Sequence, residues 1–556
     1  MLDTATAKAA SARPSVSGHG PAPIFRRLFS FPVLMGALLV GCAVVSARYN
    51  LPDPDVWWSA AVGKQILATH TVPTSDWHSF TAQGAPWMAY EWLGDIATGA
   101  AAELGGLRGM TALLLLLTAI FIALFYGYAT LISGSSKAAL IPCAIALPIL
   151  QIFFTLRPQL IGYIFLIITL ICLERFRQGK QKTLWALPPL FLIWLNTHGS
   201  FVLGLVAFAI YWGCGLTEFE AGGIIAKRWA DWQRRHMEIV FLLCVVALTV
   251  SPYGTRQAAY PLQMAFFEPV NVAHVIEWQS LPFQFWQIKL LLGLVLMFWL
   301  ALIPLRENFR LESIALLLFA TYAAFVHRRF TPFLLILLIP LLAKLIARWA
   351  PAYDPSIDHF AFNAILMALI AAGLVITLPS RRKLEDVVAK SFPLKAIAYL
   401  NQHPQPTPTL NQYKWGGYLI YSPDYHRKVF IDGRADFYEY AGVLEDYLDI
   451  TELKPDTLFL LQKYNIQSCL IHRDGALATM LAASPGWKEV YRDKLAAIFI
   501  RRPKQSSSPS GITTARPSAT GPAGKITIRT GQPDEQMRRS SNWHKACSGM
   551  GKSRAA

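Results

Sequence analysis

Long apolar runs separated by short polar segments dominate the first two thirds of this sequence. Most of the runs approach the length that a helix needs to cross a hydrocarbon layer of about 30 Å. We therefore predict a polytopic α-helical membrane protein with about eleven transmembrane helices. The predicted spans are 31–47, 110–133, 138–156, 159–174, 184–196, 200–216, 238–251, 285–304, 311–326, 330–348 and 360–378. The stretch from 184 to 216 is also compatible with one span and a re-entrant segment.

Residues 380–503 show a different pattern, in which charged residues alternate with short apolar runs. The runs YLIYS (418–422), KVFIDGR (428–434), SCLIHR (468–473) and AAIFIRR (496–502) are rich in β-branched and aromatic residues, so we predict strands there. AGVLEDYLDITEL has the spacing of a helix. The segment is predicted to form a small α/β domain of ordinary size.

Both ends of the chain lack apolar periodicity and are rich in small, polar and proline residues. The predicted organisation is a disordered N-terminal segment (1–30), a transmembrane domain (31–379), the α/β domain (380–503) and a disordered tail (504–556). The tail is assigned no activity.

Composition supports the membrane assignment, because 54% of the 556 residues are hydrophobic and only 15% are charged. Lys and Arg outnumber Asp and Glu by 51 to 34, but many of the basic residues flank apolar runs. That placement indicates membrane topology rather than nucleic-acid binding. The seven cysteines form no CxxC pair, and five lie inside apolar runs, so neither a disulfide framework nor a zinc site is indicated.

Basic residues collect before the first predicted span and in alternate connecting segments, which are therefore predicted to be cytoplasmic. The residues are Arg26, Arg27, Arg175, Arg177, Lys180, Lys182, Lys227, Arg228, Arg234, Arg235, Arg306 and Arg310. The loop 48–109 and everything after residue 379 then lie outside the cytoplasm. Leu39 to Cys42 resembles a lipoprotein cleavage box and VSA (45–47) an ordinary signal cleavage site. Cleavage stays open as an alternative and leaves residue 48 outside in either case.

The loop 48–109 carries a local excess of acidic residues. Avoidance of lysine and arginine in an outer loop is the simplest explanation, but the arrangement of residues in LPDPDVWW indicates a functional site. Pro54 pushes Asp53 toward an extended conformation, so the carboxylates of Asp53 and Asp55 tend to lie on one side of the chain. Such a pair either shares a hard cation such as Mg²⁺ or Mn²⁺ or raises one carboxyl pKa.

Aromatic residues accompany these carboxylates and suit the headgroup layer of a membrane. They are Trp57, Trp58, Trp77, Trp87, Tyr90 and Trp92. We predict that segments 55–69 and 88–104 form short helices along the membrane surface. An aromatic belt without further function is the alternative.

Short turns on the same predicted face supply basic and hydrogen-bonding residues. Arg157 lies in TLRPQL, Asn196 and His198 in WLNTHGSF, and His327, Arg328 and Arg329 in FVHRRFTP. A basic cluster outside the cytoplasm runs against the usual distribution of basic residues in membrane proteins. Binding of a phosphate group would explain the cluster. A miscounted span would instead make HRR a cytoplasmic anchor, and Asn196 and His198 are also compatible with packed polar groups between helices.

Several of these motifs together resemble a group of bacterial membrane proteins with GT-C-type glycosyltransferase architecture. The motifs are DPDVWW, TVPTSDWHSFTAQGAPWMAYEWLGD, LRPQLIGY, LWALPPLFLIWLNTHGSFVLGL, VHRRFTPF and WGGYLIY…KVFIDGRADFY. Wider relatives of the group are protein mannosyltransferases, aminoarabinose transferases and oligosaccharyltransferase catalytic subunits. WGGY is loosely similar to an acceptor-recognition motif of oligosaccharyltransferases, an analogy only.

The resemblance implies an inverting enzyme of the bacterial inner membrane that takes a sugar from a polyprenyl-phosphate-linked donor. The acceptor would be a glycan, lipid or protein. Asp53 or Asp55 would be the base, with the other aspartate assisting or binding a metal, and Glu91 or Asp95 would be the second acidic position. Mannosyltransferases show Asp-Glu where this chain has Asp-Pro-Asp, which leaves the base and the metal open.

The reaction itself explains the two kinds of charge. A sugar leaving a lipid phosphate develops positive charge at the anomeric carbon and negative charge on the phosphate, which carboxylates and arginines respectively stabilise. Arg157, Arg328 and Arg329 are the candidates for the phosphate, with His198 and His327 as hydrogen-bond donors or proton carriers. A transporter or flippase of lipid-linked saccharides and a non-catalytic scaffold in envelope assembly are the competing interpretations.

Overall fold

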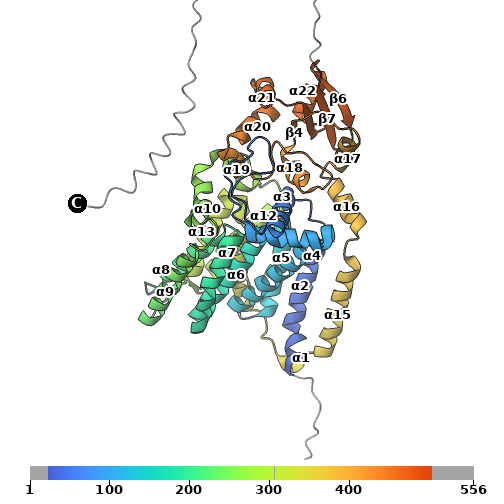
Figure 1. Ribbon diagram of the computed structural model, residues 1–556. Helices are drawn as coiled ribbons and strands as arrows, with labels where there is room; N and C mark the ends of the chain where they lie inside the picture. The colour runs from blue at the N-terminus through green and yellow to red at the C-terminus, as the bar shows by residue number, and fades with distance from the viewer. Residues whose placement is uncertain (1–22, 306, 504–556) are drawn as a thin grey trace, which may run out of the picture. The chain divides into compact units, whose positions relative to one another are not determined.

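The computed structural model describes residues 23–305 and 307–503. The predictions of disorder for most of the N-terminal segment and for the tail lie outside these residues. The described chain is mostly helical, with one small sheet among the helices and a four-stranded sheet in the C-terminal region (Figure 1).

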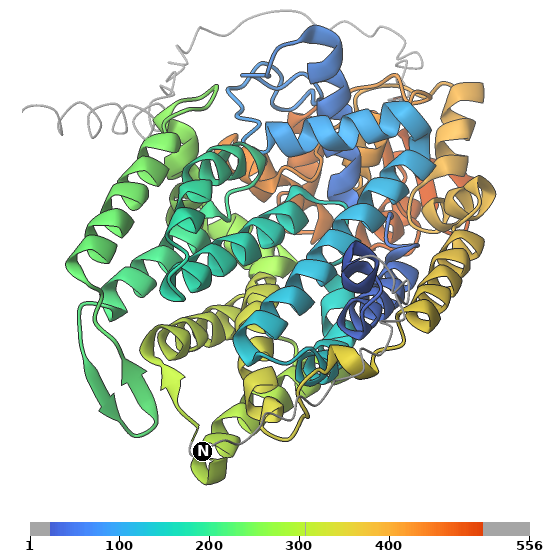
Figure 2. The ribbon, with the colours of Figure 1, turned by 90° about the horizontal axis from the view of Figure 1, so that it is seen from below.

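A helix coincides with each of the predicted apolar runs. These helices are α2 (Phe31–Ala47), α4 (Trp92–Ser133), α5 (Ser136–Leu150), α6 (Pro158–Arg177), α7 (Leu187–Thr197), α8 (Phe201–Cys214), α9 (Asp231–Ala247), α12 (Trp286–Leu305), α13 (Leu311–Val326), α14 (Thr331–Ala347) and α15 (Phe360–Thr377). Figure 2 shows α15 beside α2, on which it packs.

Within the described residues, six helices are long and apolar enough to cross a membrane. They are α4, α5 with η1 (Gln151–Phe153), α6, α12, α14 with η4 (Arg328–Phe330), and α15. Three more, α2, α8 and α13, are apolar but shorter. The chain is a multi-pass helical membrane protein at this coarser level, and the predicted number of eleven spans is not confirmed.

The first predicted outer loop contains α3 (Pro54–Thr69) and the first turns of α4. α4 bends at Gly106, whose φ of 56° only glycine adopts readily. α3 and α4 cross at Gly63 and Gly99, where an added Cβ would come under 3.0 Å from the backbone of the other helix. This close crossing brings Ser59 of α3 against Asp95 of α4.

The helices predicted at 55–69 and 88–104 are present, but their aromatic residues do not form an interfacial belt. Trp57 is fully buried against Phe392, Tyr418 and Tyr421. Trp58 and Trp87 are also buried, and only Trp77, at 64% exposure, is open. The headgroup-layer prediction is wrong for the buried rings because the C-terminal region covers them.

The C-terminal region contains a sheet in the order β4-β5-β7-β6. β4 (Thr409–Asn411) is parallel to β5 (Ser468–His472), which pairs antiparallel with β7 (Ala496–Arg501), and β7 pairs antiparallel with β6 (Trp487–Arg492). The strands predicted at 468–473 and 496–502 are confirmed. Those predicted at 418–422 and 428–434 are wrong, because the first lies in a helix and the second is an irregular loop.

Helices make up most of the rest of the C-terminal region. They are α16 (Arg381–Ala389), α17 (Leu394–Gln402), α18 (Tyr413–Tyr421), α19 (Ala435–Tyr440), α20 (Val443–Thr451), α21 (Thr457–Lys463) and α22 (Ala476–Ala483). Of these, α17 and α22 pack on the sheet. α18 packs on α3, and Ser79 of the first loop forms a parallel bridge with Val429. The C-terminal region therefore belongs to one compact unit with the described helical part.

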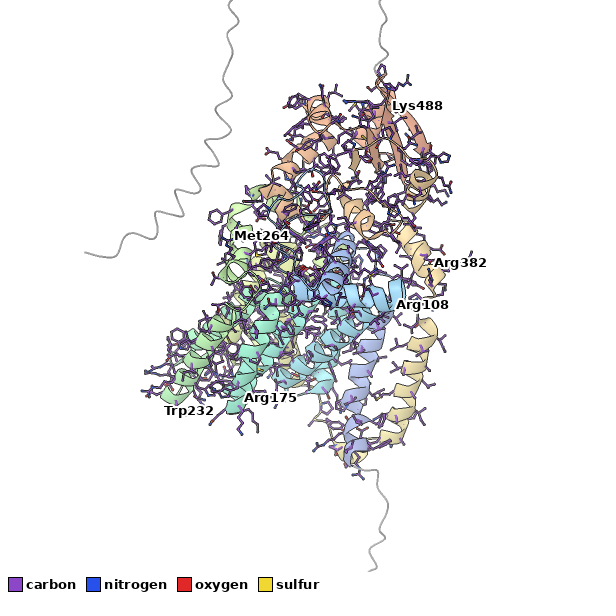
Figure 3. The ribbon with its side chains drawn as sticks, in the orientation of Figure 1. Arg108, Arg175, Trp232, Met264, Arg382 and Lys488 are labelled. Carbon is purple, nitrogen blue, oxygen red and sulfur yellow. The ribbon has the colours of Figure 1, made fainter. Side chains whose placement is uncertain are left out.

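The remaining elements connect the long helices. They are α1 (Pro23–Leu28), η2 (Gln181–Ala186), β1 (Phe219–Ala221), β2 (Ile224–Ala226), α10 (Thr255–Phe267), α11 (Pro269–His274), η3 (Ile276–Trp278), β3 (Phe309–Arg310) and η5 (Pro355–Ile357). Arg175 of α6 and Trp232 of α9 lie at the end of the helices away from Lys488 of β6, and Met264 of α10 lies between these levels (Figure 3).

Candidate active site

A cavity of about 850 Å³ lies where the first loop, the start of α6, the segment from α10 to η3, η4 and the C-terminal region meet. Its lining includes carboxylates, arginines and aromatic rings. The residues that bear on its chemistry are Asp55, Trp58, Ser59, Tyr90, Glu91, Asp95, Arg157, His198, Glu277, Trp278, Arg328, Arg329, Tyr413, Lys414, Gly433, Arg434, Asp436 and Tyr447.

Arg157 binds both aspartates of the DPD motif. Its Nε donates to the two carboxylate oxygens of Asp53 at 2.9 Å, and Nη2 lies 2.9 Å from Asp53 Oδ2. Nη1 lies 3.0 Å from Asp55 Oδ2 and also contacts Glu277. We call this group, Arg157 with Asp53, Asp55 and Glu277, the Arg157 clamp.

Local sequence places the partners of the Arg157 clamp. Pro54 occupies the first turn of α3, so Asp53 becomes its N-cap and accepts a hydrogen bond from the Asp55 backbone N–H at 3.0 Å. Pro158 likewise begins α6, which leaves Arg157 extended just before the helix. The two prolines therefore fix the backbone on both sides of the ion pairs.

The two aspartates differ in their access to the cavity. Asp53 is 9% exposed and does not line the cavity, whereas Asp55 is 29% exposed and lines it. Burial raises the pKa of Asp55 to about 7; Arg157 lowers this pKa, and the neighbouring Asp53 and Glu277 raise it. Asp55 can therefore exchange a proton near neutral pH in contact with a bound molecule.

The geometry of this pair does not fit the metal site predicted at Asp53 and Asp55. The Arg157 guanidinium occupies both oxygens of Asp53 and one of Asp55, while Asp55 Oδ1 accepts from Trp58 Nε1 at 3.4 Å. A shared Mg²⁺ or Mn²⁺ would need those oxygens as ligands. Within residues 23–305 and 307–503, no group of three or more His, Cys, Asp or Glu side chains is arranged to hold a metal ion.

Arg157, predicted as a phosphate ligand, lines the cavity, but its Nε, Nη1 and Nη2 atoms all face carboxylates in this arrangement. Burial would raise the pKa of Glu277, but Arg157, Arg329 and Arg328 together outweigh burial and hold this pKa below its ordinary value. A guanidinium that faces three carboxyl groups serves to orient them rather than to attract an anion.

Glu91 and His198 form a second polar pair on the cavity wall. His198 Nε2 lies 3.4 Å from Glu91 Oε1, and His198 Nδ1 accepts from the Ser200 backbone N–H at 3.0 Å. Burial, with Arg329 and Arg157 nearby, lowers the pKa of His198 to about 3, so the ring is neutral with its proton on Nε2. Burial and Asp95 raise the pKa of Glu91 well above its ordinary value.

Asp95 lies deepest among the predicted acidic residues. It is fully buried, and its Oδ1 accepts from Ser59 Oγ at 2.6 Å, while Oδ2 has no protein partner. Because an uncompensated buried charge is costly, this position favours an uncharged carboxyl. Asp95 lines the cavity but is less suited than Asp55 to take a proton from a substrate.

Two residues predicted to bind substrate, Asn196 and His327, make contacts within the protein and do not line the cavity. Asn196 accepts from Trp92 Nε1 at 2.8 Å and donates to the carbonyls of Leu192 and Val250. His327 Nδ1 contacts the carbonyl of Trp278. The alternative of packed polar groups between helices therefore describes Asn196, whereas His198 does reach the cavity.

Arg328 and Arg329 line the cavity from η4. Arg329 lies over the Trp278 ring, with 4.2 Å between the guanidinium carbon and the ring centroid. Within the described part of the chain, neither guanidinium has a carboxylate within 4.0 Å. These two arginines are therefore available to bind an anion in the cavity.

A second arginine group was missed from the sequence. Arg434 Nε donates to Asp432 Oδ1 at 2.8 Å, and Nη2 lies 2.6 Å from Asp432 Oδ2 and 2.8 Å from Asp76 Oδ1. We call Arg434 with Asp76 and Asp432 the Arg434 clamp. Burial would raise the pKa of Asp432, but Arg434 holds it below its ordinary value.

The segment around Glu277 and Trp278 was also missed as part of the site. It lies between the predicted spans 238–251 and 285–304, where IEW offers no spacing that separates it from other loop sequence. In the sequence, Arg434 ends KVFIDGR (428–434), for which the pattern predicts a strand, and it also lies in the KVFIDGRADFY motif of the resemblance. Its carboxylate partner Asp76 is more than three hundred residues away, and only the fold brings them together.

Neither protein-family models nor curated protein sequences give a match to this chain. Comparison with solved structures does give matches. The archaeal oligosaccharyltransferase AglB from Archaeoglobus fulgidus, in complex with an inhibitory peptide and a dolichol-phosphate, matches with a TM-score of 0.45 and 9% identity, over 79% of this chain and 69% of that chain. ArnT from Cupriavidus metallidurans bound to undecaprenyl phosphate matches with a TM-score of 0.43 and 15% identity, over 83% of this chain and 96% of that chain. Both kinds of protein are among the relatives that the sequence resemblance named.

Proposed function

We propose that this protein is an inverting membrane glycosyltransferase that moves a sugar from a polyprenyl-phosphate-linked donor to an envelope acceptor on the extracytoplasmic face. One observation carries the proposal. One cavity is lined by Asp55, whose pKa burial raises to about 7, and by Arg328 and Arg329, neither of which has a carboxylate within 4.0 Å among the residues that the structure describes. Such a site can accept a proton at one end and stabilise a departing phosphate at the other.

The reaction assigns a role to each side. The Asp55 carboxylate takes the proton of the acceptor hydroxyl while that oxygen forms a bond to the anomeric carbon. The bond between the anomeric carbon and the phosphate oxygen breaks, and its electron pair stays on the lipid phosphate. Arg328 and Arg329 stabilise that charge, and attack from the opposite side inverts the anomeric centre.

The other predicted residues support Asp55 in this proposal. Arg157 orients the Asp55 carboxylate, and Asp53 holds Arg157 while capping α3. Glu91, Asp95 and His198 form a mostly uncharged polar wall that offers hydrogen bonds to sugar hydroxyls. No step requires a metal ion.

The membrane face follows from the distribution of basic residues and is part of the proposal. It predicts that the HRR turn and the C-terminal region lie outside the cytoplasm, with the N-terminus inside. A cysteine at position 328, in a cysteine-free variant, should react with a membrane-impermeant thiol reagent in intact cells whose outer membrane is opened. Labelling only after lysis would refute this topology.

Deletion of the gene tests the function directly. Comparison of lipid-linked sugars and envelope glycans between the deletion strain and its parent should show an accumulated donor or a glycan that lacks a sugar. A plasmid copy of the native gene should restore the parental profile, and an Asp55→Asn copy should not. An unchanged profile under several growth conditions would contradict the enzyme and favour the scaffold interpretation.

A further inference from the structure

Three glycines allow the C-terminal region to touch the first turn of α3. A Cβ added at Gly417 would come under 3.0 Å from the Pro54 carbonyl oxygen, and one at Gly416 would overlap the Ile431 carbonyl and Asp432. Both neighbours are backbone, which cannot move aside cheaply. The glycine pair of WGGY is therefore needed for a close approach of α18 to α3 and to the loop before α19.

Gly433 makes a second close contact between the C-terminal region and the first turns of α3. A Cβ at Gly433 would come under 3.0 Å from Asp55 Oδ1 and would lie 3.0 Å from Trp58 Nε1. The backbone of Gly433 thus lies against the carboxylate oxygen that accepts from Trp58. Asp55 is enclosed by Arg157 on one side and by a glycine of the C-terminal region on the other.

The Arg434 clamp fixes this glycine in place. Arg434 follows Gly433 directly, is 2% exposed and binds Asp76 of the first loop together with Asp432. Tyr438 adds a hydroxyl that donates to Asp432 Oδ2 at 2.7 Å, and Thr81 donates to the Phe430 carbonyl at 2.5 Å. The turn cannot move away from Asp55 without breaking a buried ion pair that joins two distant parts of the chain.

We propose that the Asp432-Gly433-Arg434 turn is a positioning element for Asp55, so that the C-terminal region completes the candidate active site. Gly433 confines the carboxylate to the position in which Arg157 binds it, and the Arg434 clamp holds Gly433 there. This inference rests on the proposed role of Asp55 as the base. It also gives WGGY a packing role that differs from the acceptor-recognition analogy.

Gly433→Ala tests the contact at the carboxylate. The new methyl group displaces a side-chain oxygen rather than backbone, so the protein should fold while the Asp55 carboxylate moves off Arg157. The charged groups that shift the pKa of Asp55 are Arg157, Asp53 and Glu277, and Asp55 in turn acts on the titratable groups of Glu91 and Tyr413. Weaker contact with the single cation among them should raise the titration midpoint of Asp55 by about one pH unit.

The midpoint is measurable from infrared difference spectra of protein with and without Asp55→Asn, recorded from about pH 5 to about pH 9. The matched control is Gly486→Ala in the same region, where the nearest atom to an added Cβ is 3.9 Å away. Gly486→Ala should leave the midpoint unchanged. An unchanged midpoint in Gly433→Ala would overturn the proposal.

A stability cycle tests the same contact without any assay of activity. Gly433→Ala should lower the unfolding temperature in the native background and less in an Asp55→Ala background, where the obstructing carboxylate is absent. If Gly433→Ala alone does not fold, Asp55→Ala should restore folding. Equal losses in both backgrounds, or no restoration, would overturn the proposal. Because neither readout needs sugar transfer, absence of transfer by the native protein would refute the proposed function and leave this contact standing.

Discussion

The Arg157 clamp and the Arg434 clamp have similar contacts but differ in their exposure to solvent. Each joins the first loop to a distant segment through one guanidinium and at least two carboxylates. The Arg157 side chain is 20% exposed and faces the cavity, whereas Arg434 is 2% exposed. The open clamp leaves Asp55 able to gain or lose a proton, whereas the closed clamp holds the pKa of Asp432 below its ordinary value.

Because of this difference, we expect the two clamps to respond differently when the arginine is replaced. Near Arg157, Asp55 already has a pKa of about 7 and can take up a proton in place of the lost cation. Near Arg434, the side chains of Asp432 and Asp76 are fully enclosed with the guanidinium between them, and Arg434 holds the pKa of Asp432 below its ordinary value. Removal of a buried partner is costly because the remaining charge has no solvent.

The largest expected effect is therefore on stability, from Arg434→Ala. We expect a loss of about 3–5 kcal/mol in the free energy of unfolding, measured by denaturant or thermal unfolding of the purified protein. Arg157→Ala serves as the comparison and should lose clearly less. Equal losses for the two variants would remove the distinction between the clamps.

The next effect concerns phosphate binding at η4. The double variant Arg328→Gln/Arg329→Gln should lower the affinity for undecaprenyl phosphate by about ten- to a hundredfold, since hydrogen bonds to a charged group contribute about 1.5–3 kcal/mol. Binding can be followed by native mass spectrometry. Arg382→Gln, in exposed α16, is the control and should bind normally. Undiminished binding by the double variant would place the phosphate elsewhere.

The open clamp should also give the reaction a pH dependence. Because the base must be ionised and the pKa of Asp55 is raised to about 7, the rate should fall as the pH falls below about 7, roughly tenfold per unit. Initial rates of sugar transfer over this range are the measurement. A rate that stays constant down to about pH 5 would mean that Asp55 is not the titrating base.

The smallest effect separates the two aspartates of DPD. Asp53→Asn keeps an N-cap of comparable quality and retains one acceptor for Arg157. We expect a loss of about 1 kcal/mol in stability and a change of only a few-fold in transfer rate, measured beside the native protein. A loss of activity as complete as that expected for Asp55→Asn would assign the base role to Asp53 instead.

The membrane helices were predictable because their pattern is local. Each apolar run from 31 to 378 coincides with a helix, since burial in lipid demands the same residues throughout a span. Their number was less predictable, because α7 and α9 are short or carry charged residues and composition alone does not assign them to a bilayer.

The C-terminal region was predicted less well because short apolar runs do not distinguish a strand from a helix. YLIYS lies in α18, where Trp415 and Leu419 are buried one turn apart. KVFIDGR contains the Arg434 clamp instead of a strand, since Asp432 and Arg434 bond to each other and to the first loop.

Part of the candidate site was also predictable, because those residues lie in motifs that are local in the sequence. The predicted site residues that line the cavity are Asp55, Glu91, Asp95, Arg157, His198, Arg328 and Arg329. The separation of Asp53 from Asp55 was not predictable, because it depends on where the Arg157 guanidinium points. Glu277 and Arg434 depend equally on contacts between segments far apart in the chain.

The most direct test of the central claim compares membranes that contain native protein with membranes that contain Asp55→Asn at equal abundance. Each is supplied with the lipid-linked sugar that accumulates in the deletion strain, and release of the lipid phosphate is measured. The native protein should consume the donor, and Asp55→Asn should be slower by about a hundred- to ten-thousandfold. Equal consumption by the two would contradict the assignment of Asp55 as the base.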